Sequence, residues 1–527
     1  MSSSASPPPA GGPTRRRLPA RWQGAVLGLI VAIVAAGILL SGRTSDDIER
    51  NAAFSGADVE TSQGAQVIPQ GHPADDGFRW PIFGGNPQRT HALSVKTQLR
   101  PPFRTVWARR SNIQIEFPPV ICGRSLYLLR NDAVLIKLSR RTGVGVWKRK
   151  LGALAASSPA CSDSKIYVSV LERGKGIKAG KVVAVDAEYG RTVWTKNLRG
   201  RTESSPLLWR DRLYLGTEDG SVIALRTRDG AQRWRTPTEG AVKGAVAMSG
   251  GKLFVGDYSG RIYALRRTDG AIRWVKRPVA GGLSLRAGSF YSSPSVAFGR
   301  LYIGSTDGAV YSLSTSTGKT AWRRKTGDYV YSSPAVGSPG GHPSVFVGSY
   351  DKKIYALDAR TGAVRWSRGT GGRISGSPTL VGDTVWIASL GRRSTFAYRA
   401  TDGLERWRTN RGAYTAVVSD GRRIYLNGLT TLYGIDGTGV RFERGESPVP
   451  SSTDPVESKK PAWQRHAEAR DARGGSGTPT TPEPSTAPGT PATPTTEPEP
   501  EPLPTVVRPS DGRDPAPFFS DQDPRDR

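Results

Sequence analysis

The chain is 527 residues long and contains 13 Trp, 63 Gly and 40 Pro but only two Met. This composition argues against a helical bundle and favours many short strands joined by glycine-containing turns. Four His and two Cys leave little material for a metal centre or a nucleophilic triad. The formal charge of +30 is concentrated in residues 78–445, which hold 60 Lys and Arg against 24 Asp and Glu. Such a field favours anionic partners, although an arginine-rich solvated surface would give the same excess.

The N-terminal region contains one long apolar segment. Residues 24–41 carry no charge, and a helix of this length, at about 1.5 Å per residue, just spans the hydrocarbon core of a bilayer. Four arginines precede the segment and three acidic residues follow it. Because positive charge favours the cytoplasmic side, we expect residues 1–23 in the cytoplasm, a transmembrane helix at 24–41 and an extracytoplasmic linker at 42–77. A cleavable signal peptide is the alternative, but no clear cleavage site follows the apolar run.

Residues 78–445 contain an internal repeat. A Gly followed four residues later by Trp recurs seven times, with units of roughly 40 residues. Each unit reads as four short strands, separated by turn pairs such as Asp219-Gly220 and Asp307-Gly308. A sheet of this kind has two apolar faces, so it needs a neighbour on each side, and a closed ring of sheets supplies both. We therefore predict an all-β fold, an eight-bladed β-propeller of four-stranded antiparallel blades.

The repeated tryptophans are predicted to be structural. Each should wedge between two adjacent blades, where an indole buries about 150–250 Å². The eighth unit has no Trp after Asp436-Gly437, and the strand FRTVWARR at 103–110 stands before the first unit at the matching register. We expect this strand to complete the last blade and close the ring, which leaves no open sheet edge. The predicted wedge residues are Trp107, Trp147, Trp194, Trp234, Trp274, Trp322, Trp366 and Trp407.

Two tracts resemble the PQQ-enzyme repeat family. IYALDARTGAVRW at 354–366 is similar to its TGxxxW unit with the preceding strand, and WPIFGGNPQRT at 80–90 resembles the segment before the first blade in that family. One branch, the quinoprotein alcohol dehydrogenases, is eight-bladed and holds pyrroloquinoline quinone with Ca²⁺ over the axial channel. Another branch, the propeller component of the outer-membrane barrel-assembly machinery, has no cofactor and offers its loops to protein partners.

The residues favour the branch without a cofactor. Most units here are minimal, whereas the dehydrogenases generally have long loops that cap the quinone. A Ca²⁺ site needs about six to eight converging oxygens, and we can place no Asp general base beside a Glu–Asn pair. We therefore transfer no catalytic, cofactor-binding or metal-binding residue, and we keep pyrroloquinoline quinone and calcium only for the alternative function. Barrel assembly is not transferred as the biological role, because this chain has a predicted membrane anchor and a Pro/Thr-rich tail of the kind that reaches into a cell wall.

The two cysteines fall on the first strands of neighbouring predicted blades. Cys122 is three residues after Pro119 and Cys161 is two residues after Pro159, so their side chains have opposite parity. Adjacent blades face one another with opposite sheet faces, and opposite parity therefore lets the two side chains meet. A disulfide in an oxidising compartment is the hypothesis, and two small buried thiols are the alternative.

Side chains just before the Pro that opens each blade are predicted to face the axial channel, where a propeller usually binds a ligand. Hydroxyl groups and a few charges there could hold a small ligand, or they could only bond the strand starts and channel water. The candidate residues are Glu203, Lys243, Tyr291, Ser292, Asp328, Tyr331, Ser332, Arg373 and Tyr414. Acidic residues that recur in the second hairpin of each unit are explained by turn chemistry.

The C-terminal composition changes after the repeats. Residues 446–527 are rich in Pro and Thr and nearly devoid of large apolar side chains. Such a segment cannot bury enough surface to offset its ordering entropy, so we predict a disordered tail.

These patterns predict a membrane-anchored, extracytoplasmic scaffold or ligand-sensing propeller, and they favour binding over catalysis. Its expected partners are the cytoplasmic membrane and a protein or an anionic polymer of the cell envelope. Nucleic acid is not expected, because no element suited to reading a groove is present. One alternative is a quinoprotein oxidoreductase that oxidises alcohols or sugars with a degenerate site. The other is a cell-wall-associated structural protein whose tail contacts the wall.

Overall fold

The computed structural model describes residues 78–172, 179–278, 288–415 and 417–438. The predicted transmembrane helix at 24–41, its flanking segments and the predicted tail at 446–527 lie outside the described residues. Within the described residues, no helix has both the length and the apolar character needed to cross a bilayer.

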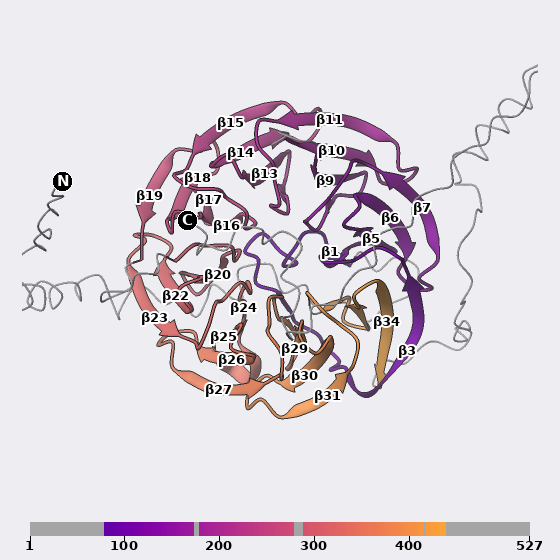
Figure 1. The fold of residues 1–527 in the computed structure, drawn as a ribbon, viewed down its shortest axis with the longest axis vertical. Coiled ribbons are helices and arrows are strands. Elements are labelled where there is room, and N and C mark those ends of the chain that lie inside the picture. Colours follow the sequence, from indigo (N-terminus) through magenta and orange to yellow (C-terminus); the bar gives the residue numbers. More distant parts are fainter. Residues whose placement is uncertain (1–77, 173–178, 279–287, 416, 439–527) are drawn as a thin grey trace, which may run out of the picture.

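Eight sheets stand around a central axis and form a disc (Figure 1). Each blade has four antiparallel strands, from an inner strand at the axis to an outer strand at the rim, and in blades 1 to 7 these four strands are consecutive in the chain. Two short N-terminal strands, β1 (Arg79–Trp80) and β2 (Ala92–Leu93), add a fifth strand to the sheets of blades 1 and 7. The predicted all-β propeller of eight four-stranded antiparallel blades is confirmed.

The first half of the disc consists of blades 1 to 4. Blade 1 contains β4 (Val120–Cys122), β5 (Ser125–Leu129), β6 (Val134–Ser139) and β7 (Gly145–Lys150). Blade 2 contains β8 (Ala160–Cys161), β9 (Lys165–Leu171), β10 (Gly180–Asp186) and β11 (Thr192–Leu198). Blade 3 contains β12 (Leu207–Trp209), β13 (Arg212–Thr217), β14 (Ser221–Arg226) and β15 (Gln232–Pro237). Blade 4 contains β16 (Ala247–Ser249), β17 (Lys252–Gly256), β18 (Ile262–Arg266) and β19 (Ile272–Lys276).

The second half consists of blades 5 to 8. Blade 5 contains β20 (Ser295–Ala297), β21 (Arg300–Gly304), β22 (Ala309–Ser314) and β23 (Thr320–Lys325). Blade 6 contains β24 (Ala335–Gly337), the 3-10 turn η2 (Pro339–Gly341), β25 (Ser344–Gly348), β26 (Lys353–Asp358) and β27 (Val364–Gly369). Blade 7 contains β28 (Thr379–Val381), β29 (Thr384–Ser389), β30 (Ser394–Arg399) and β31 (Glu405–Thr409). Blade 8 contains β32 (Val417–Ser419), β33 (Arg423–Asn427), β34 (Thr431–Thr438) and β3 (Arg100–Arg110).

Blade 8 joins the two ends of the repeat region, as the sequence predicts. The N-terminal strand β3 pairs antiparallel with β34 and places Trp107 opposite Gly434. Arg423 of this blade is buried, forms an ion pair with Asp436 at 2.5 Å and also donates to the Arg141 carbonyl of blade 1 at 2.5 Å. The ring is therefore closed by strand pairing and by a buried guanidinium that bridges the last and first blades.

The repeated tryptophans lie between adjacent blades. The Trp322 ring of blade 5 packs against Gly362 of blade 6, where φ is 71° and an added Cβ would lie 2.7 Å from the ring. A larger residue would therefore clash with the indole and strain the turn. The Trp–Gly pairs are Trp107–Gly143, Trp147–Gly190, Trp194–Gly230, Trp234–Gly270, Trp274–Gly318, Trp322–Gly362 and Trp366–Gly403. Trp407 instead packs against Phe103 of blade 8, with ring centroids 5.4 Å apart.

Polar groups reinforce the same junctions. Five indole N–H groups donate to a backbone carbonyl of the next blade, in the pairs Trp194–Thr227, Trp234–Arg267, Trp274–Thr315, Trp322–Ala359 and Trp366–Ala400. At several junctions the residue two positions after the Trp also donates to the carbonyl of the paired Gly. These donors are Arg149, Thr236, Arg324 and Arg368. Part of the basic character of the rim is therefore structural.

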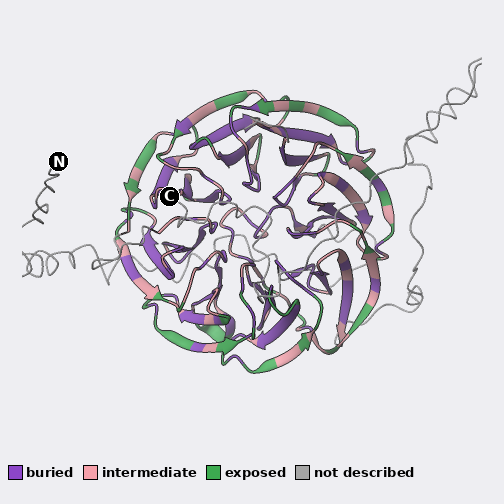
Figure 2. Ribbon diagram, viewed as in Figure 1, coloured by how far each residue is buried: buried purple, intermediate pink, exposed green. Residues whose placement is uncertain are grey.

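Burial follows the distance from the axis (Figure 2). The second strands β21, β25 and β33 are buried along their whole length, whereas outer strands such as β7 and β15 include exposed residues. The apolar core lies between the faces of neighbouring blades, where successive sheets pack on one another.

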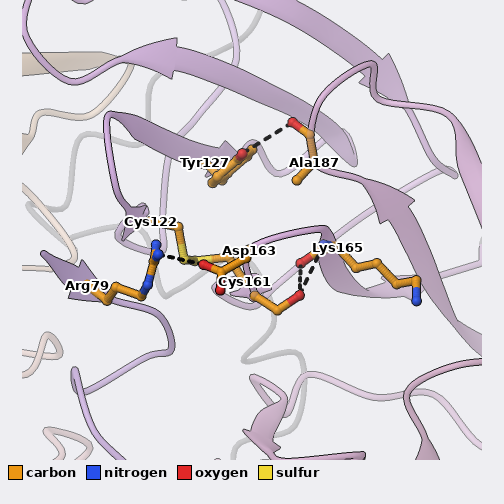
Figure 3. The surroundings of a disulfide bond; sticks show 8 residues. Arg79, Cys122, Tyr127, Cys161, Asp163, Lys165 and Ala187 are labelled. Atoms are coloured by element: carbon orange, nitrogen blue, oxygen red, sulfur yellow. Dashed lines mark hydrogen bonds and ion pairs between the residues drawn. A yellow bond between two sulfur atoms is a disulfide. The ribbon is translucent and has the colours of Figure 1, made fainter. Parts of the chain in front are cut away.

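The two cysteines are joined by a disulfide bond, with their Cα atoms 6.5 Å apart (Figure 3). Cys122 ends the inner strand of blade 1 and Cys161 ends that of blade 2. Close by, Arg79 of β1 forms an ion pair with the exposed Asp163 at 2.5 Å. The bond thus links two neighbouring blades where the N-terminal segment docks on them.

Candidate functional site

Residues 78–93, here called the plug segment, cross the axis of the disc (Figure 1). Its strand β1 pairs with β4 of blade 1, and β2 pairs in parallel with β28 of blade 7. Between these strands, its backbone carbonyls accept hydrogen bonds from the inner strands of five blades. The donor–acceptor pairs are Cys161–Pro81, Met248–Pro87, Val296–Gln88, Val336–Thr90 and Leu380–His91, at 2.7–2.9 Å. The plug segment therefore fastens most of the blades to one another at the centre.

Two basic side chains of the plug segment, Arg89 and His91, are buried inside the fold. Arg89 is fully buried and donates to the carbonyls of Phe83, Ser205 and Val246 at 2.5, 3.0 and 2.8 Å. Burial lowers the pKa of Arg89 to about 9. His91 is also buried, and burial together with the nearby Arg89 charge lowers its pKa to about 3. Arg89 thus stays charged and His91 stays neutral at physiological pH.

Serine side chains before the inner strands link neighbouring blades. Ser292 donates to the Ser332 carbonyl of the next blade at 3.0 Å, and Ser332 accepts from the Gly348 backbone N–H at 3.2 Å. One residue further on, serine hydroxyls accept backbone N–H groups across blades in the pairs Ser158–Ser205, Ala245–Ser293, Ser293–Ser333 and Ser333–Ser377. The structure thus places the candidate hydroxyl of Ser292 between blades 5 and 6, and that of Ser332 within blade 6.

A second set of side chains lies on the connection face, the face where each outer strand leads into the next inner strand, as between β11 and β12. Glu203, in that connection, is buried and its Oε1 lies 3.0 Å from Lys243 Nζ, in the next connection. The Tyr291 hydroxyl donates to Glu203 Oε2 at 3.4 Å. Burial raises the pKa of Glu203, and the Lys243 ammonium opposes this rise. Three candidate residues from blades 3, 4 and 5 therefore form one contact group.

Four tyrosines continue this group around the axis and form what we call the tyrosine arc: Tyr258, Tyr291, Tyr331 and Tyr350. Consecutive ring centroids are 6.4, 5.6 and 4.9 Å apart. At one end Lys243 Nζ lies 5.4 Å from the Tyr258 centroid, and at the other Arg373 lies 5.8 Å from that of Tyr350. The four tyrosine residues are all of intermediate exposure. The row of four aromatic rings therefore has a cation–π contact at each end.

A second buried carboxylate, Glu116, lies before the inner strand of blade 1. Asn131 donates to its Oε2 at 2.9 Å, and burial raises its pKa to about 7. Its charge helps to raise the pKa values of Tyr291 and Tyr414, after the larger effect of burial in each case. Glu116 therefore lies near Tyr291 of blade 5 and Tyr414 of blade 8.

The remaining candidates have local surroundings. Tyr414 is buried in a small cluster with Leu390 and Leu429. The Asp328 side chain accepts the Tyr329 backbone N–H at 2.8 Å, which is a local turn contact. The structure thus brings Glu203, Lys243, Tyr291, Tyr331 and Arg373 to the same part of the connection face. It uses Ser292, Ser332 and Asp328 to hold backbone.

Sequence reasoning missed three residues of this region. Glu116 stands three residues before Pro119, the same offset that separates Glu203 from Pro206, so the repeat contained its signal. Tyr258 and Tyr350 flank acidic residues of the second hairpins, and that position had been explained by turn chemistry alone. Their approach to the arc depends on the packing of hairpins from different blades.

The site offers few groups to a quinone–calcium pair. Among the described residues, no group of three His, Cys, Asp or Glu side chains is arranged to hold a metal ion. The two buried carboxylates are bonded to Lys243 and Asn131, and the plug segment crosses the axis. These residues do not form the converging oxygen set that Ca²⁺ requires.

Comparison with solved structures finds other propellers of this type. BamB from Moraxella catarrhalis is 18% identical with a TM-score of 0.51, over 63% of this chain and 99% of that chain. A quinohemoprotein alcohol dehydrogenase, ADHIIG from Pseudomonas putida HK5, is 13% identical with a TM-score of 0.58, over 81% and 88% of the two chains. The quinohemoprotein alcohol dehydrogenase from Comamonas testosteroni is 15% identical with a TM-score of 0.53, over 70% and 82%. At these identities the likeness shows the fold alone.

A comparison with known protein families identifies the family to which this chain belongs. The family described as "Outer membrane protein assembly factor BamB" matches residues 130–277, 218–335 and 332–446. Nothing among the curated proteins matches this chain. Because the matched segments together cover more than half of its length, the chain belongs to this BamB family of PQQ-repeat β-propellers.

Proposed function

We propose that this protein is a protein-binding scaffold that holds its partner through the tyrosine arc. The observation that carries the proposal is the run of four tyrosines of intermediate exposure from blades 4, 5 and 6, with Lys243 and Arg373 at its two ends. Tyrosine and arginine are enriched at the energetic centres of protein interfaces, because they combine large apolar area with a polar tip. The plug segment and the serine bonds between blades give the arc a rigid support.

The chemistry of the arc also suggests the character of the partner. The two flanking cations and the excess of basic residues in the propeller favour a partner surface with acidic residues around an apolar anchor. Glu203 is paired with Lys243 and offsets its charge, so Arg373 and the basic excess of the propeller carry most of this attraction.

The proposal places the propeller outside the cytoplasm, anchored by residues 24–41. The charge pattern around this segment supports the orientation, and the Cys122–Cys161 disulfide supports an oxidising compartment. Protease treatment of cells stripped of their wall should digest the propeller while cytoplasmic proteins remain intact. A propeller that is cut only after the membrane is broken would contradict this location.

A cross-linking and pull-down experiment from solubilised membranes tests the role of the arc. The double variant Tyr331→Ala, Tyr350→Ala should lose at least nine-tenths of the partner that the native protein captures, because it removes the two closest rings. Leu404→Ala at the rim, where Leu404 is 54% exposed, removes exposed apolar area elsewhere and should keep the partner. Equal capture by the arc variant and the native protein would refute the proposal.

The quinoprotein alternative has its own measurement. Pyrroloquinoline quinone and Ca²⁺ are added to the full-length protein, and dye-linked oxidation of alcohols and sugars is followed. We expect no turnover above the background without protein. Turnover that depends on both additions would replace the scaffold role with an oxidoreductase role.

A further inference from the structure

A pocket of about 400 Å³ lies between blades 2 and 3, away from the tyrosine arc. Blade 2 contributes its outer strand β11 and the following loop, and blade 3 contributes β13, β14 and β15. Its lining includes Lys196, Leu198, Arg199, Ile223, Gln232 and Arg235. Its volume lies within the range of about 300–1,000 Å³ that is usual for small-molecule sites.

Blade 3 differs from blades 4, 5 and 6 at one position of the third strand, where blades 1 and 2 also carry an aliphatic residue, Ile136 and Val183. In blades 4, 5 and 6, the third strand carries a tyrosine whose hydroxyl bonds the acidic residue of the second hairpin. These pairs are Tyr263–Asp257, Tyr311–Asp307 and Tyr355–Asp351. The strand registers place Ile223 of blade 3 at the same position, opposite Leu215 of the second strand. Isoleucine is shorter and has no hydroxyl, so the volume that a phenol ring occupies in those blades is left open here.

The blade 2 wall of the pocket carries cations. Trp194, Lys196 and Leu198 alternate along β11 and therefore point to one face of the sheet, which is the face toward blade 3, since the Trp194 indole donates to Thr227 of that blade at 2.9 Å. Lys196 stands two residues after the Trp, where other blades have a donor to the paired Gly carbonyl. Within the described residues, neither Lys196 nor Arg199 of the following loop has a carboxylate partner.

The blade 3 wall holds one further cation in a fixed position. Arg235 donates to Asp219 Oδ2 and to Ser221 Oγ, both at 2.8 Å. Asp219 therefore offsets Arg235, whereas the charges of Lys196 and Arg199 remain uncompensated among the described residues. Two positive charges around a polar pocket match a ligand group with about two negative charges.

We infer that this pocket binds a phosphate monoester carried on a hydroxylated carbon chain, such as a sugar phosphate or a polyol phosphate. A phosphate monoester carries about 1.5 to 2 negative charges at neutral pH, which matches the two uncompensated cations. Arg235, already oriented by Asp219, can add a directional hydrogen bond to the phosphate. The amide side chain of Gln232 can bond a hydroxyl of the carbon chain. The proposal does not depend on the tyrosine arc.

Isothermal titration of the full-length protein tests the inference with glucose 6-phosphate and glycerol 3-phosphate. Both monoesters should bind, and glucose itself should not. Lys196→Gln should weaken binding at least tenfold. Ile223→Tyr keeps every cation but fills the pocket with the side chain that blades 4 to 6 carry naturally, so it should abolish binding while the protein stays folded. Circular dichroism and the melting temperature check that folding.

Two controls separate the pocket from the general positive charge. Lys148→Gln removes an exposed cation from the outer strand of blade 1, and it should bind both monoesters as the native protein does. Poly(glycerol phosphate), a diester with one charge per phosphate, should bind more weakly per phosphate than the monoesters. The inference fails if neither monoester binds, if Ile223→Tyr and Lys148→Gln bind alike, or if only the polymer binds.

Discussion

The plug segment and the tyrosine arc both lie near the axis, yet they use polar side chains in opposite ways. Arg89 of the plug segment is fully buried, and its guanidinium donates hydrogen bonds to three backbone carbonyls. The arc presents partly exposed rings and the cations Lys243 and Arg373. A charged or hydroxylated residue near the axis of a propeller is therefore not by itself a sign of a ligand site. Its partners decide whether it holds the fold or remains available for recognition.

The largest expected loss of stability comes from removing the Arg89 guanidinium. Arg89→Met keeps most of the stem but leaves the three carbonyls unpaired, and each unsatisfied buried group costs about 1–2 kcal/mol, so the free energy of unfolding should fall by about 3–6 kcal/mol. Chemical denaturation followed by circular dichroism measures the change. Arg233→Met, at an exposed position on β15, is the control and should change stability by less than about 0.5 kcal/mol. Equal stability of the two variants would show that Arg89 does not support the plug segment.

The disulfide lies where the plug segment docks, so we expect it to support the fold as Arg89 does. Cys122 lies opposite Arg79 in the β1–β4 pairing, and the Cys161 backbone N–H donates to Pro81. The crosslink spans 39 residues, and loop-closure entropy for that length corresponds to about 4 kcal/mol. The variant Cys122→Ser, Cys161→Ser should lose up to this amount in chemical denaturation. The native protein kept in reductant should lose the same amount, and no loss under either condition would contradict the expected role.

A pH series distinguishes the buried carboxylate Glu116 from the rest of the fold. Burial raises its folded-state pKa to about 7 from the ordinary value of 4.5, so the folded protein holds a proton that the unfolded chain releases. Stability contributed by this proton is therefore present below about pH 4.5 and lost as pH rises to about 7. Relative to Glu116→Gln, the native protein should lose about 3 kcal/mol across this window.

The buried His91 should change stability with pH in the opposite direction. Its pKa is lowered to about 3, so the unfolded chain takes up a proton before the folded protein does. Stability from neutral His91 is lost as pH falls below about 6.5. Because this trend is common to the native protein and Glu116→Gln, it cancels in their difference. A difference between the two proteins that does not change with pH would refute the shift at Glu116.

The smallest effect on stability is expected at the arc. Tyr331→Ala removes a partly exposed ring, so it should change the free energy of unfolding by about 1 kcal/mol, but it should weaken partner binding at least tenfold. Denaturation and quantitative pull-down are measured on the same preparation. Loss of binding that only follows loss of folded protein would remove the distinction between the plug segment and the arc.

Much of the fold could be predicted from the spacing of Gly and Trp, because each unit must bury two faces and repetition implies a ring. The strand FRTVWARR could be assigned to the last blade, since that unit lacked its own outer strand. The site was less predictable. Glu203 and Tyr291 follow from their position three residues before the inner-strand Pro, and Lys243 holds the equivalent position in blade 4, where Val246 replaces the Pro. The next position, however, selects serines that bond neighbouring strands.

The sequence by itself determined the number of blades, the wedge tryptophans and the parity of the two cysteines, because these depend on short-range periodicity. Only the tertiary structure decided which polar groups are already bonded, since their partners come from blades distant in the chain. Ile223 illustrates the difference. Its place in the repeat is readable from sequence, but a missing phenol ring becomes a pocket only where Lys196, Arg199 and the next blade surround the space it leaves.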